Sequence, residues 1–500
     1  MTANDLPFSL TTDSLAVWLD SLATQQPASA ANQLNQALKQ LRNAPSEPSQ
    51  LLPLFINLTP PCLFLSNSLS PINLAEANHK LTSKSIKVAK LVTQMLRQLA
   101  LGFCMLAESE KLDRAQNPLA IYYALQMIGH CLRSYHLLYE IPSSSLWKKS
   151  ASLYGLASET HSLEQSLSPK LHEFKAQPTI AAVLKRNILF SIFKPTHFTA
   201  PEINTLFQMA NEHYDSIDLS TRNNHDFGYY WNLEGEEPCV IKHASKHLPE
   251  GFLAIDCRRF ADTLQQNTFK TNLKPTTQAK LALQLSHYED VFNAMQIGSS
   301  SVYQLLIGYS DVCRYFQEQD KLAKILSVST GGKPQIRRMG LVPLDKDKDY
   351  FESRHIPNKA PLPFKKVNLM RTNSNRFAIV QSRALDCAVG DIALLYKEQQ
   401  PAALAVIRQM IVHDLSGDLH VLLEYIQGTC SIFAFTNASG AGSHALVING
   451  ETDDPEVILP PDKYSVDSNL VLKVGITLHL NACLEYSASF VQFKIKITDS

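Results

Sequence analysis

Apolar residues recur every three or four positions through most of the first 214 residues, which predicts amphipathic helices. At the first such repeat, Thr12 and Asp13 precede an apolar stripe of Leu15, Trp18 and Leu22, as expected of a capped helix. The rest of this region is predicted to hold a Pro- and Ser-rich connection with short apolar pieces at 51–58 and 62–64, and helices at 34–41, 86–108, 118–140, 144–167, 178–193 and 201–214. Short connections between such helices predict a helical bundle or short solenoid over residues 1–214.

The hydrophobic pattern becomes mixed after residue 214. Strands are predicted at 227–233, 239–242, 252–256 and 301–307, and helices at 258–264, 277–295 and 311–326. We therefore predict a small α+β module over residues 215–328. Residues 329–366 are rich in proline and alternating charge, which is typical of a linker.

The last quarter of the chain is a series of short runs of β-branched and aromatic residues separated by Gly, Asp and Asn. These runs lie at 376–382, 392–396, 404–412, 419–425, 431–436, 444–449, 469–474 and 490–497. Strands at this spacing predict a small C-terminal β-barrel or β-sandwich over residues 367–500. The fold class is thus multidomain α and β.

Charge and composition limit the classes of binding partner and the cellular location that we expect for this chain. Lys plus Arg and Asp plus Glu both number 46, so the net charge is zero and general attraction to nucleic acid is not expected. The chain has neither a secretory signal pattern nor a long apolar run, and its nine scattered cysteines form no C-x-x-C pair. We expect a cytoplasmic protein without membrane insertion.

Motif searches for catalytic chemistry give nothing. Thr330-Gly-Gly-Lys333 resembles the end of a phosphate loop, but the first glycine is missing and Pro334 replaces Ser or Thr. His243 and His247 are spaced for one helical face, but no third metal ligand accompanies them. We therefore predict no catalytic residues, no metal and no cofactor.

Basic residues in the predicted linker suggest ligand binding. Arg337 and Arg338, with Lys333 nearby, lie shortly before the predicted barrel. Guanidinium groups bind phosphate with two parallel hydrogen bonds and stack on purine faces. An arginine arm beside a barrel is therefore a workable nucleotide clamp.

The arrangement after residue 330 resembles the PilZ-type domain, a bacterial cyclic di-GMP receptor fold, and this resemblance implies a C-terminal six-stranded antiparallel β-barrel over residues 367–500. That family carries R-x-x-x-R in an arm and [D/N]-x-S-x-x-G on its first strands. The segment 372–377 is similar to the second motif: Ser374 matches, whereas Thr372 and Phe377 differ. Val389-Gly390-Asp391 and Val406-Ile407-Arg408 are similar to later strands of the family. Because no R-x-x-x-R occurs, Lys333 and Arg337 are the nearest substitute for the arm.

The resemblance implies cyclic di-GMP as ligand, bound by six residues: Lys333, Arg337, Arg338, Thr372, Ser374 and Arg376. It also implies a non-enzymatic regulatory or adaptor protein that acts in surface attachment or type IV pilus control, with a protein partner bound by the helical region. Two alternatives stay open. One is a helical protein-binding scaffold without a nucleotide ligand, and the other is an enzyme whose site is assembled from distant residues.

Overall fold

In the computed structural model the chain forms two compact units, Met1–Glu289 and Asp290–Ser500. The described residues are 6–75, 81–109, 111–171, 173–174, 177–221, 227–235, 237–242, 250–266, 273–286, 296–297, 301–329, 361–373, 376–383, 385–412, 418–436 and 440–499. Most of the predicted linker, including Lys333, Arg337 and Arg338, lies outside them. None of the helices within these ranges is long and apolar enough to cross a membrane.

The N-terminal unit is mainly helical, as predicted. Its helices are α1 (Thr12–Ala23), α2 (Pro27–Arg42), α3 (Pro48–Ser68), α4 (Pro71–Leu74), α5 (Ser83–Ala107), α6 (Gln116–Leu137), α7 (Ser144–Glu159), α8 (Ile180–Ile192) and α9 (Ala200–His213). Local signals explain several starts: the side chains of Thr11, Thr82 and Thr179 accept hydrogen bonds from the first turns of α1, α5 and α8. At α9, Thr199 and Glu202 form a reciprocal capping box.

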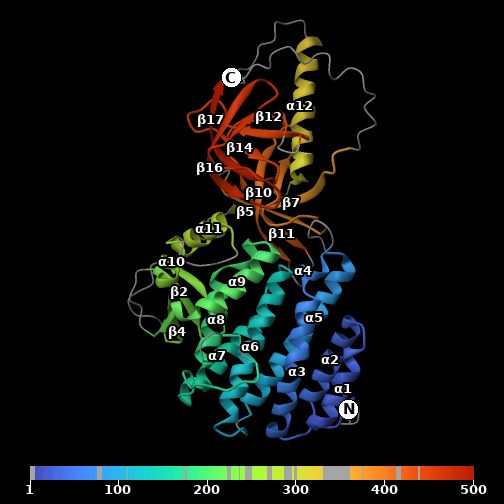
Figure 1. The fold of residues 1–500 in the computed structure, drawn as a ribbon, viewed down its shortest axis with the longest axis vertical. Helices are drawn as coiled ribbons and strands as arrows, with labels where there is room; N and C mark the ends of the chain where they lie inside the picture. Colours follow the sequence, from blue (N-terminus) through green and yellow to red (C-terminus); the bar gives the residue numbers. More distant parts are fainter. Residues whose placement is uncertain are drawn as a thin grey trace. The chain divides into compact units, whose positions relative to one another are not determined.

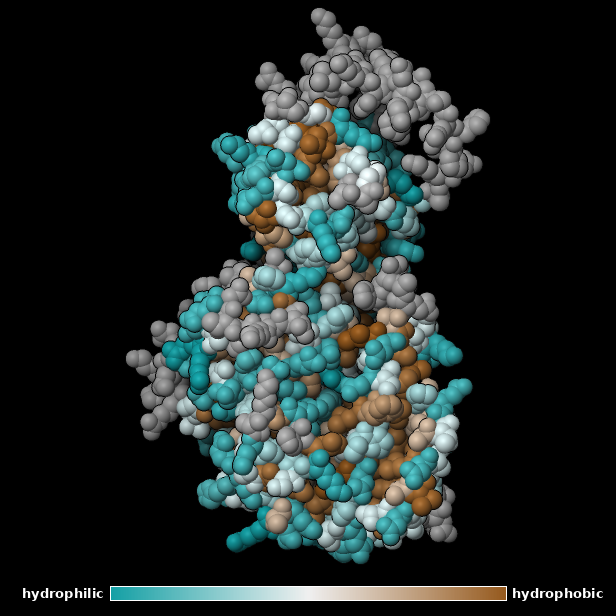
Figure 2. Space-filling model, viewed as in Figure 1, coloured by the Kyte–Doolittle hydropathy of each residue, from teal (hydrophilic) through white to brown (hydrophobic). Residues whose placement is uncertain are grey.

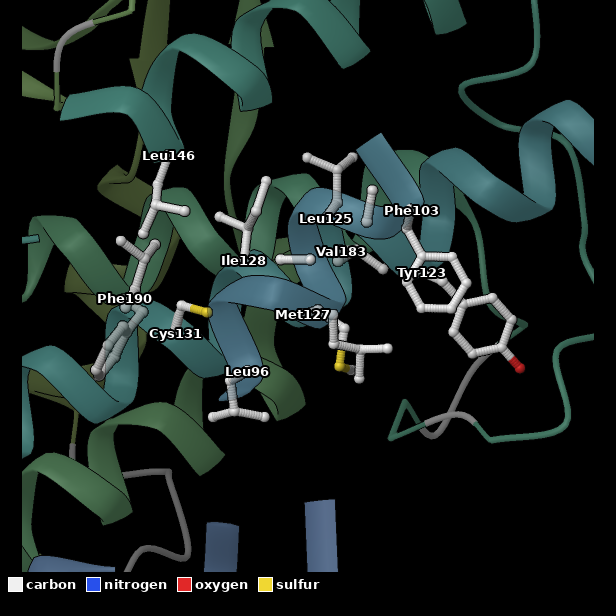
Figure 3. Close-up of a cluster of buried hydrophobic side chains, with 14 of the residues drawn as sticks. Leu96, Phe103, Tyr123, Leu125, Met127, Ile128, Cys131, Leu146, Val183 and Phe190 are labelled. Atoms are coloured by element: carbon white, nitrogen blue, oxygen red, sulfur yellow. The ribbon is translucent and has the colours of Figure 1, made fainter. Parts of the chain in front are cut away.

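Helix α6 lies at the centre of this unit, since residues on nearly its whole circumference are buried. Figure 3 shows Leu125, Ile128 and Cys131 of α6 among side chains of the neighbouring helices, including Val183 and Phe190 of α8. All five of these side chains are fully buried, with an exposed fraction of 0 %. The core of the unit therefore forms around α6.

Helix α3 differs from the prediction of two short apolar pieces. It is one continuous helix, although Pro53, Pro60 and Pro61 lie inside it. Each internal proline removes one helical hydrogen bond, but the buried face, with Phe55 and Leu58 fully enclosed, offsets that loss. Figure 2 shows hydrophobic surface over the part of the unit that α3 and α5 occupy.

The predicted middle strands and helices up to residue 286 belong to the same unit. Strands β1 (Asp218–Ser220), β2 (Phe227–Asn232), β3 (Cys239–Lys242) and β4 (Phe252–Asp256) form a sheet in the order β1-β4-β2-β3, followed by α10 (Arg258–Gln265) and α11 (Pro275–Ser286). Trp231 of β2 packs against Trp147 and Tyr154 of α7, with ring centroids 6.1 and 5.9 Å away. The sheet thus shares the hydrophobic core of the helices.

The C-terminal unit contains a closed six-stranded antiparallel barrel, which confirms the predicted fold class. Its strands are β6 (Val302–Ile307), β7 (Lys365–Asn373), β8 (Phe377–Ser382), β9 (Ile392–Tyr396), β10 (Ala403–Val412) and β11 (Leu419–Tyr425). They pair in the ring β6-β7-β8-β11-β10-β9-β6, and the short β5 (Gln296–Ile297) adds to β7. We name this ring the first barrel.

Two elements that were predicted to belong to the middle module lie in the C-terminal unit instead. The run at 301–307 forms β6, which pairs with β7 and β9, and the helix predicted at 311–326 lies within α12 (Tyr309–Ser329). Strand β7 itself begins inside the predicted linker. The alternation Val367 buried, Asn368 exposed, Leu369 buried marks it as a half-buried strand. The exact domain boundaries stay predictions.

The last strands form a second barrel with the same order. Its strands are β12 (Cys430–Thr436), β13 (Gly442–Ile448), β14 (Glu456–Leu459), β15 (Asn469–Val471), β16 (Ile476–Tyr486) and β17 (Val491–Asp499). They pair as β12-β13-β14-β17-β16-β15, and a bridge between Phe435 and Leu472 joins the two ends. If the six strands of each barrel are numbered in chain order, both barrels have the same ring of neighbours, 1-2-3-6-5-4. Figure 1 shows these strands in orange and red.

The two barrels share a hydrophobic interface that α12 (Tyr309–Ser329) completes. Side chains on β13 point alternately to its two faces, and both faces are apolar. Ala445 and Val447 face the interior of the second barrel, whereas Leu446 and Ile448 belong to the cluster that the two barrels share. The hydroxyl of Tyr309 lies 2.7 and 2.9 Å from carbonyl oxygens of the second barrel. The barrels and α12 therefore form one packed body.

Candidate ligand site on the first barrel

The hairpin formed by β7 and β8 carries the segment predicted to bind the ligand. Its strands are antiparallel, with Thr372 opposite Ala378 and Asn373 opposite Phe377. The ladder shifts by one residue between Leu369 and Arg371, which is a β-bulge. A bulge bends and twists the strand locally, and so changes the direction of the residues beyond it.

Two of the six predicted ligand residues, Thr372 and Arg376, are described in the structure. The Thr372 hydroxyl donates a hydrogen bond to the backbone oxygen of Phe377 at 3.3 Å, and so helps to close the hairpin. Arg376 is exposed, its guanidinium lies 4.9 Å from the centroid of the Phe377 ring, and its backbone oxygen accepts a hydrogen bond from Tyr425. Ser374, like the three predicted arm residues, lies outside the described residues.

Phe377 stands where the family motif has glycine, and the structure explains how it is accommodated. Its side chain is 6 % exposed and joins Ile379 and Leu422 in a small cluster on β8 and β11. The ring is therefore part of the packing of the barrel. It also provides an aromatic face for Arg376.

The hairpin is strongly basic, although the whole chain is neutral. Between residues 353 and 385 the sequence contains no Asp or Glu. The described cations of this stretch are all exposed, and they are Lys365, Lys366, Arg371, Arg376 and Arg383. Across from the hairpin, Asp418 pairs with Arg383 at 3.3 Å. A concentration of positive charge on one hairpin favours an anionic ligand.

The Val389-Gly390-Asp391 segment has a structural role. Gly390 adopts a φ of +87°, which favours glycine, and turns the chain into β9. The Asp391 carboxylate accepts a hydrogen bond from the backbone of Ala388 at 2.7 Å and another from the hydroxyl of Ser489. This turn therefore fixes the start of β9 and joins it to the second barrel.

Arg408, from the third segment of the resemblance, also joins the barrels. Its Nε donates to Glu424 of β11 at 2.6 Å, and its other nitrogen binds Glu485 of β16. Burial opposes its charge, but the two carboxylates prevail and keep the pKa of Arg408 above its ordinary value. Both carboxylates already occupy this guanidinium, so Arg408 supports the site rather than binding a ligand.

The structure gives no indication of a metal centre within its described part, where no three side chains of His, Cys, Asp or Glu gather closely enough to hold an ion. His243 and His247 lie outside that part. The chemistry that the described hairpin offers is recognition of an anion by guanidinium and ammonium groups.

The fold and the basic hairpin are those of a multidomain protein that combines a helical domain with tandem β-barrels. Residues 13–224 match the family model described as the N-terminal domain of the cyclic-di-GMP receptor FimW. The predicted resemblance to a cyclic di-GMP receptor with a helical N-terminal region is confirmed for this part of the chain. No curated protein and no solved structure matched the chain.

Two further features are visible in the sequence but were not among the predictions. The first is the acid-free stretch around the β7–β8 hairpin. The second is the segment Asn437-Ala438-Ser439-Gly440-Ala441-Gly442, which satisfies the [D/N]-x-S-x-x-G pattern in full. It connects β12 and β13 of the second barrel, and Asn437 to Ser439 lie outside the described residues. A search for the motif along the whole chain would have found it.

Proposed function

We propose that this protein is a non-enzymatic receptor for cyclic di-GMP that acts in the cytoplasm through protein partners. The observation that carries the proposal is the exposed, acid-free β7–β8 hairpin on a six-stranded barrel. The family match of residues 13–224 supports the same ligand. Cyclic di-GMP carries two phosphate groups and two purine rings, which guanidinium groups recognise by paired hydrogen bonds and by stacking.

The ligand contacts belong to this proposal. Arg337 and Arg338, with Lys333, are proposed to reach the ligand from the segment that precedes β7, while Thr372, Ser374 and Arg376 lie on the hairpin. A control of surface attachment or of type IV pili, with the helical domain as the partner surface, is the proposed output. The match of residues 13–224 with the N-terminal domain of a receptor supports a regulatory output.

Isothermal titration of the full-length chain with cyclic di-GMP tests the proposal. The fragment 333–500 is not suitable, because it lacks β6 and α12 and cannot close the first barrel. We expect binding by the wild-type chain and its loss in Arg337→Ala/Arg338→Ala. Exposed Arg258, whose guanidinium binds Asp256 at 2.6 Å, provides a control variant, Arg258→Ala. Absence of binding by a folded wild-type chain would reject the proposal.

Two serine variants locate the ligand. Ser374→Ala changes the hairpin of the first barrel, and Ser439→Ala changes the complete motif of the second barrel. Weaker binding in the first variant alone supports the β7–β8 hairpin. Weaker binding in the second alone would place the ligand on the second barrel.

A further inference from the structure

A line of polar side chains runs through the apolar core of the helical unit. Tyr122, Gln126, His130 and Arg133 are three or four residues apart on α6 and therefore share one face. Their exposed fractions are 0, 0, 3 and 9 %. Most other buried side chains of α6 are apolar or small, so this polar face stands in a largely apolar core.

Helices α8 and α9 present further polar groups to the same place. Arg186 of α8 is fully buried, and its guanidinium donates to Asn187 at 2.7 Å, to Asn211 at 2.9 Å and to the backbone oxygen of Gln126 at 3.4 Å. The guanidiniums of Arg186 and Arg133 lie 4.7 and 5.1 Å from the centroid of the Phe207 ring. We call Tyr122, Gln126, His130, Arg133 and Arg186 the Arg186 cluster.

Glu173, from the connection between α7 and α8, supplies the negative charge of the cluster. One oxygen of its carboxylate lies 2.9 Å from Nε2 of His130, and the other lies 3.3 Å from Arg186. Burial would raise the pKa of Glu173, but His130 and the two arginines prevail and lower it, so the carboxylate is ionised. The side chain is 29 % exposed.

Charge and hydrogen bonding are both incomplete in this cluster. Burial lowers the pKa of His130, which leaves two guanidinium charges against the one carboxylate of Glu173. In addition, the Tyr122 hydroxyl, both amide atoms of Gln126 and Nδ1 of His130 have no hydrogen-bond partner among the described residues. Each buried polar atom that lacks a hydrogen-bond partner destabilises a fold. A bound oxyanion would balance the excess positive charge and would accept hydrogen bonds from the Tyr122 hydroxyl and from Nε2 of Gln126.

We propose that the Arg186 cluster is a binding site for an oxyanion of the phosphate class, and that Glu173 occupies it as an internal carboxylate in this structure. Two guanidiniums supply charge-assisted donors, and the Tyr122 hydroxyl and Gln126 amide supply neutral ones. Glu173 is more exposed than the groups it contacts, and so can leave the cluster when the oxyanion enters. The site lies wholly within the helical unit.

The test uses Glu173→Gln in the full-length chain, with inorganic phosphate as the probe and chloride at equal ionic strength as the reference. Glu108→Gln is the matched control, because Glu108 is 27 % exposed and pairs with one cation, Lys149, at 2.6 Å. Thermal unfolding is followed by tryptophan fluorescence, since Trp18, Trp147 and Trp231 all lie in the N-terminal unit. We expect phosphate to raise the unfolding temperature of Glu173→Gln by several degrees, and that of the wild type and the control by less.

Equal responses of Glu173→Gln and Glu108→Gln to phosphate would overturn the proposal. Glu173→Asp, which withdraws the carboxylate by one methylene, replaces Glu173→Gln if the latter does not fold, with the same expected order. A parallel arm with cyclic di-GMP on Glu173→Gln/Arg376→Ala distinguishes the source of the phosphate. Stabilisation there indicates a nucleotide, whereas a response to inorganic phosphate alone indicates free phosphate. Because this readout does not depend on the barrel, its failure is separate from failure of the proposed receptor function.

Discussion

Arg408 of the first barrel and Glu485 of the second form an ion pair, so one guanidinium connects β10 to β16. The same guanidinium also holds Glu424 of β11 at 2.6 Å. All three side chains are 20–30 % exposed, which places the triad at the edge of the barrel interface. Two carboxylates are brought together there, and a single positive charge neutralises their repulsion in part.

Arg408→Met is expected to lower the free energy of unfolding of the C-terminal unit by about 2–3 kcal/mol, because it leaves two half-buried carboxylates without their cation. Urea unfolding followed by circular dichroism measures this change, since the unit has no tryptophan. Lys494→Met is the control, because Lys494 pairs with Asp454 at 3.0 Å on the exposed surface. There we expect about 0–1 kcal/mol. Equal effects of the two variants would contradict the role of Arg408.

Two glycines of the helical unit give a matched pair of variants. A Cβ at Gly129 of α6 would lie 2.2 Å from Oδ1 of Asn187 and 2.6 Å from a guanidinium nitrogen of Arg186, whereas a Cβ at Gly155 of α7 would meet nothing within 4 Å. Gly129→Ala should therefore destabilise the unit by about 1–3 kcal/mol through overpacking. Gly155→Ala should stabilise it by up to about 1 kcal/mol through helix propensity. Chemical unfolding followed by tryptophan fluorescence measures both; a stable Gly129→Ala variant would show that α6 and α8 separate easily.

The stability of the helical unit is expected to decrease as the pH falls below neutrality. The pKa of His136 is lowered from 6.5 to about 4. Burial is the main cause and Lys194 adds to it, whereas Glu237 opposes the shift. Between these values the unfolded chain binds a proton that the folded chain does not, so the stabilisation is complete above about pH 6.5 and is lost towards pH 4. The total loss from His136 is roughly 3 kcal/mol.

Unfolding measured from pH 5 to pH 8 tests this pH dependence, because the loss of the Glu173 carboxylate begins at lower pH. His130, whose pKa is also lowered by burial, acts in the same direction. His136→Asn should therefore reduce the slope without abolishing it. The exposed His161 provides the control His161→Asn, whose slope should equal that of the wild type. An unchanged slope in His136→Asn would show that His136 is not the group responsible.

Arg376→Ala is expected to weaken binding of cyclic di-GMP by roughly 10- to 100-fold, as the loss of one charge-assisted contact implies. Arg376→Lys should recover only part of this loss, because an ammonium group cannot stack or form the paired hydrogen bonds of a guanidinium. Titration calorimetry on the full-length chain gives both constants. Full affinity in Arg376→Ala would exclude this side chain from the site.

Strands and helices with a clear local pattern could be predicted from the sequence. The runs at 392–396 and 419–425 correspond to β9 and β11 residue for residue. Pairing could not be predicted, because the pattern of 302–307 identifies a strand but not its partners, β7 and β9, which lie far along the chain. The prolines at 357, 361 and 363 also obscured the start of β7, although Lys365 to Leu369 alternates clearly.

The β7–β8 hairpin that carries the candidate site could be predicted from the sequence only in part, and the ligand contacts stay predictions. The motif at 372–377 directed attention to the β7–β8 hairpin, and the structure places Thr372 and Arg376 at its end. The β-bulge and the packing of Phe377 depend on neighbouring strands, so they could not be read from the segment alone. The Arg186 cluster was missed for the same reason: His130 and Glu173 are 43 residues apart, and only the fold brings them together.

The contact of Tyr309 with the second barrel has a consequence for the nascent chain. Its hydroxyl meets carbonyl oxygens that lie 135 and 149 residues further along, so α12 leaves the ribosome long before its docking surface exists. During that interval the apolar side of α12 and the open end of the first barrel are exposed to aggregation. A chain that ends after β11 should therefore fold poorly, because it lacks the second barrel against which α12 packs. Translation must reach the last strands before the C-terminal unit can fold.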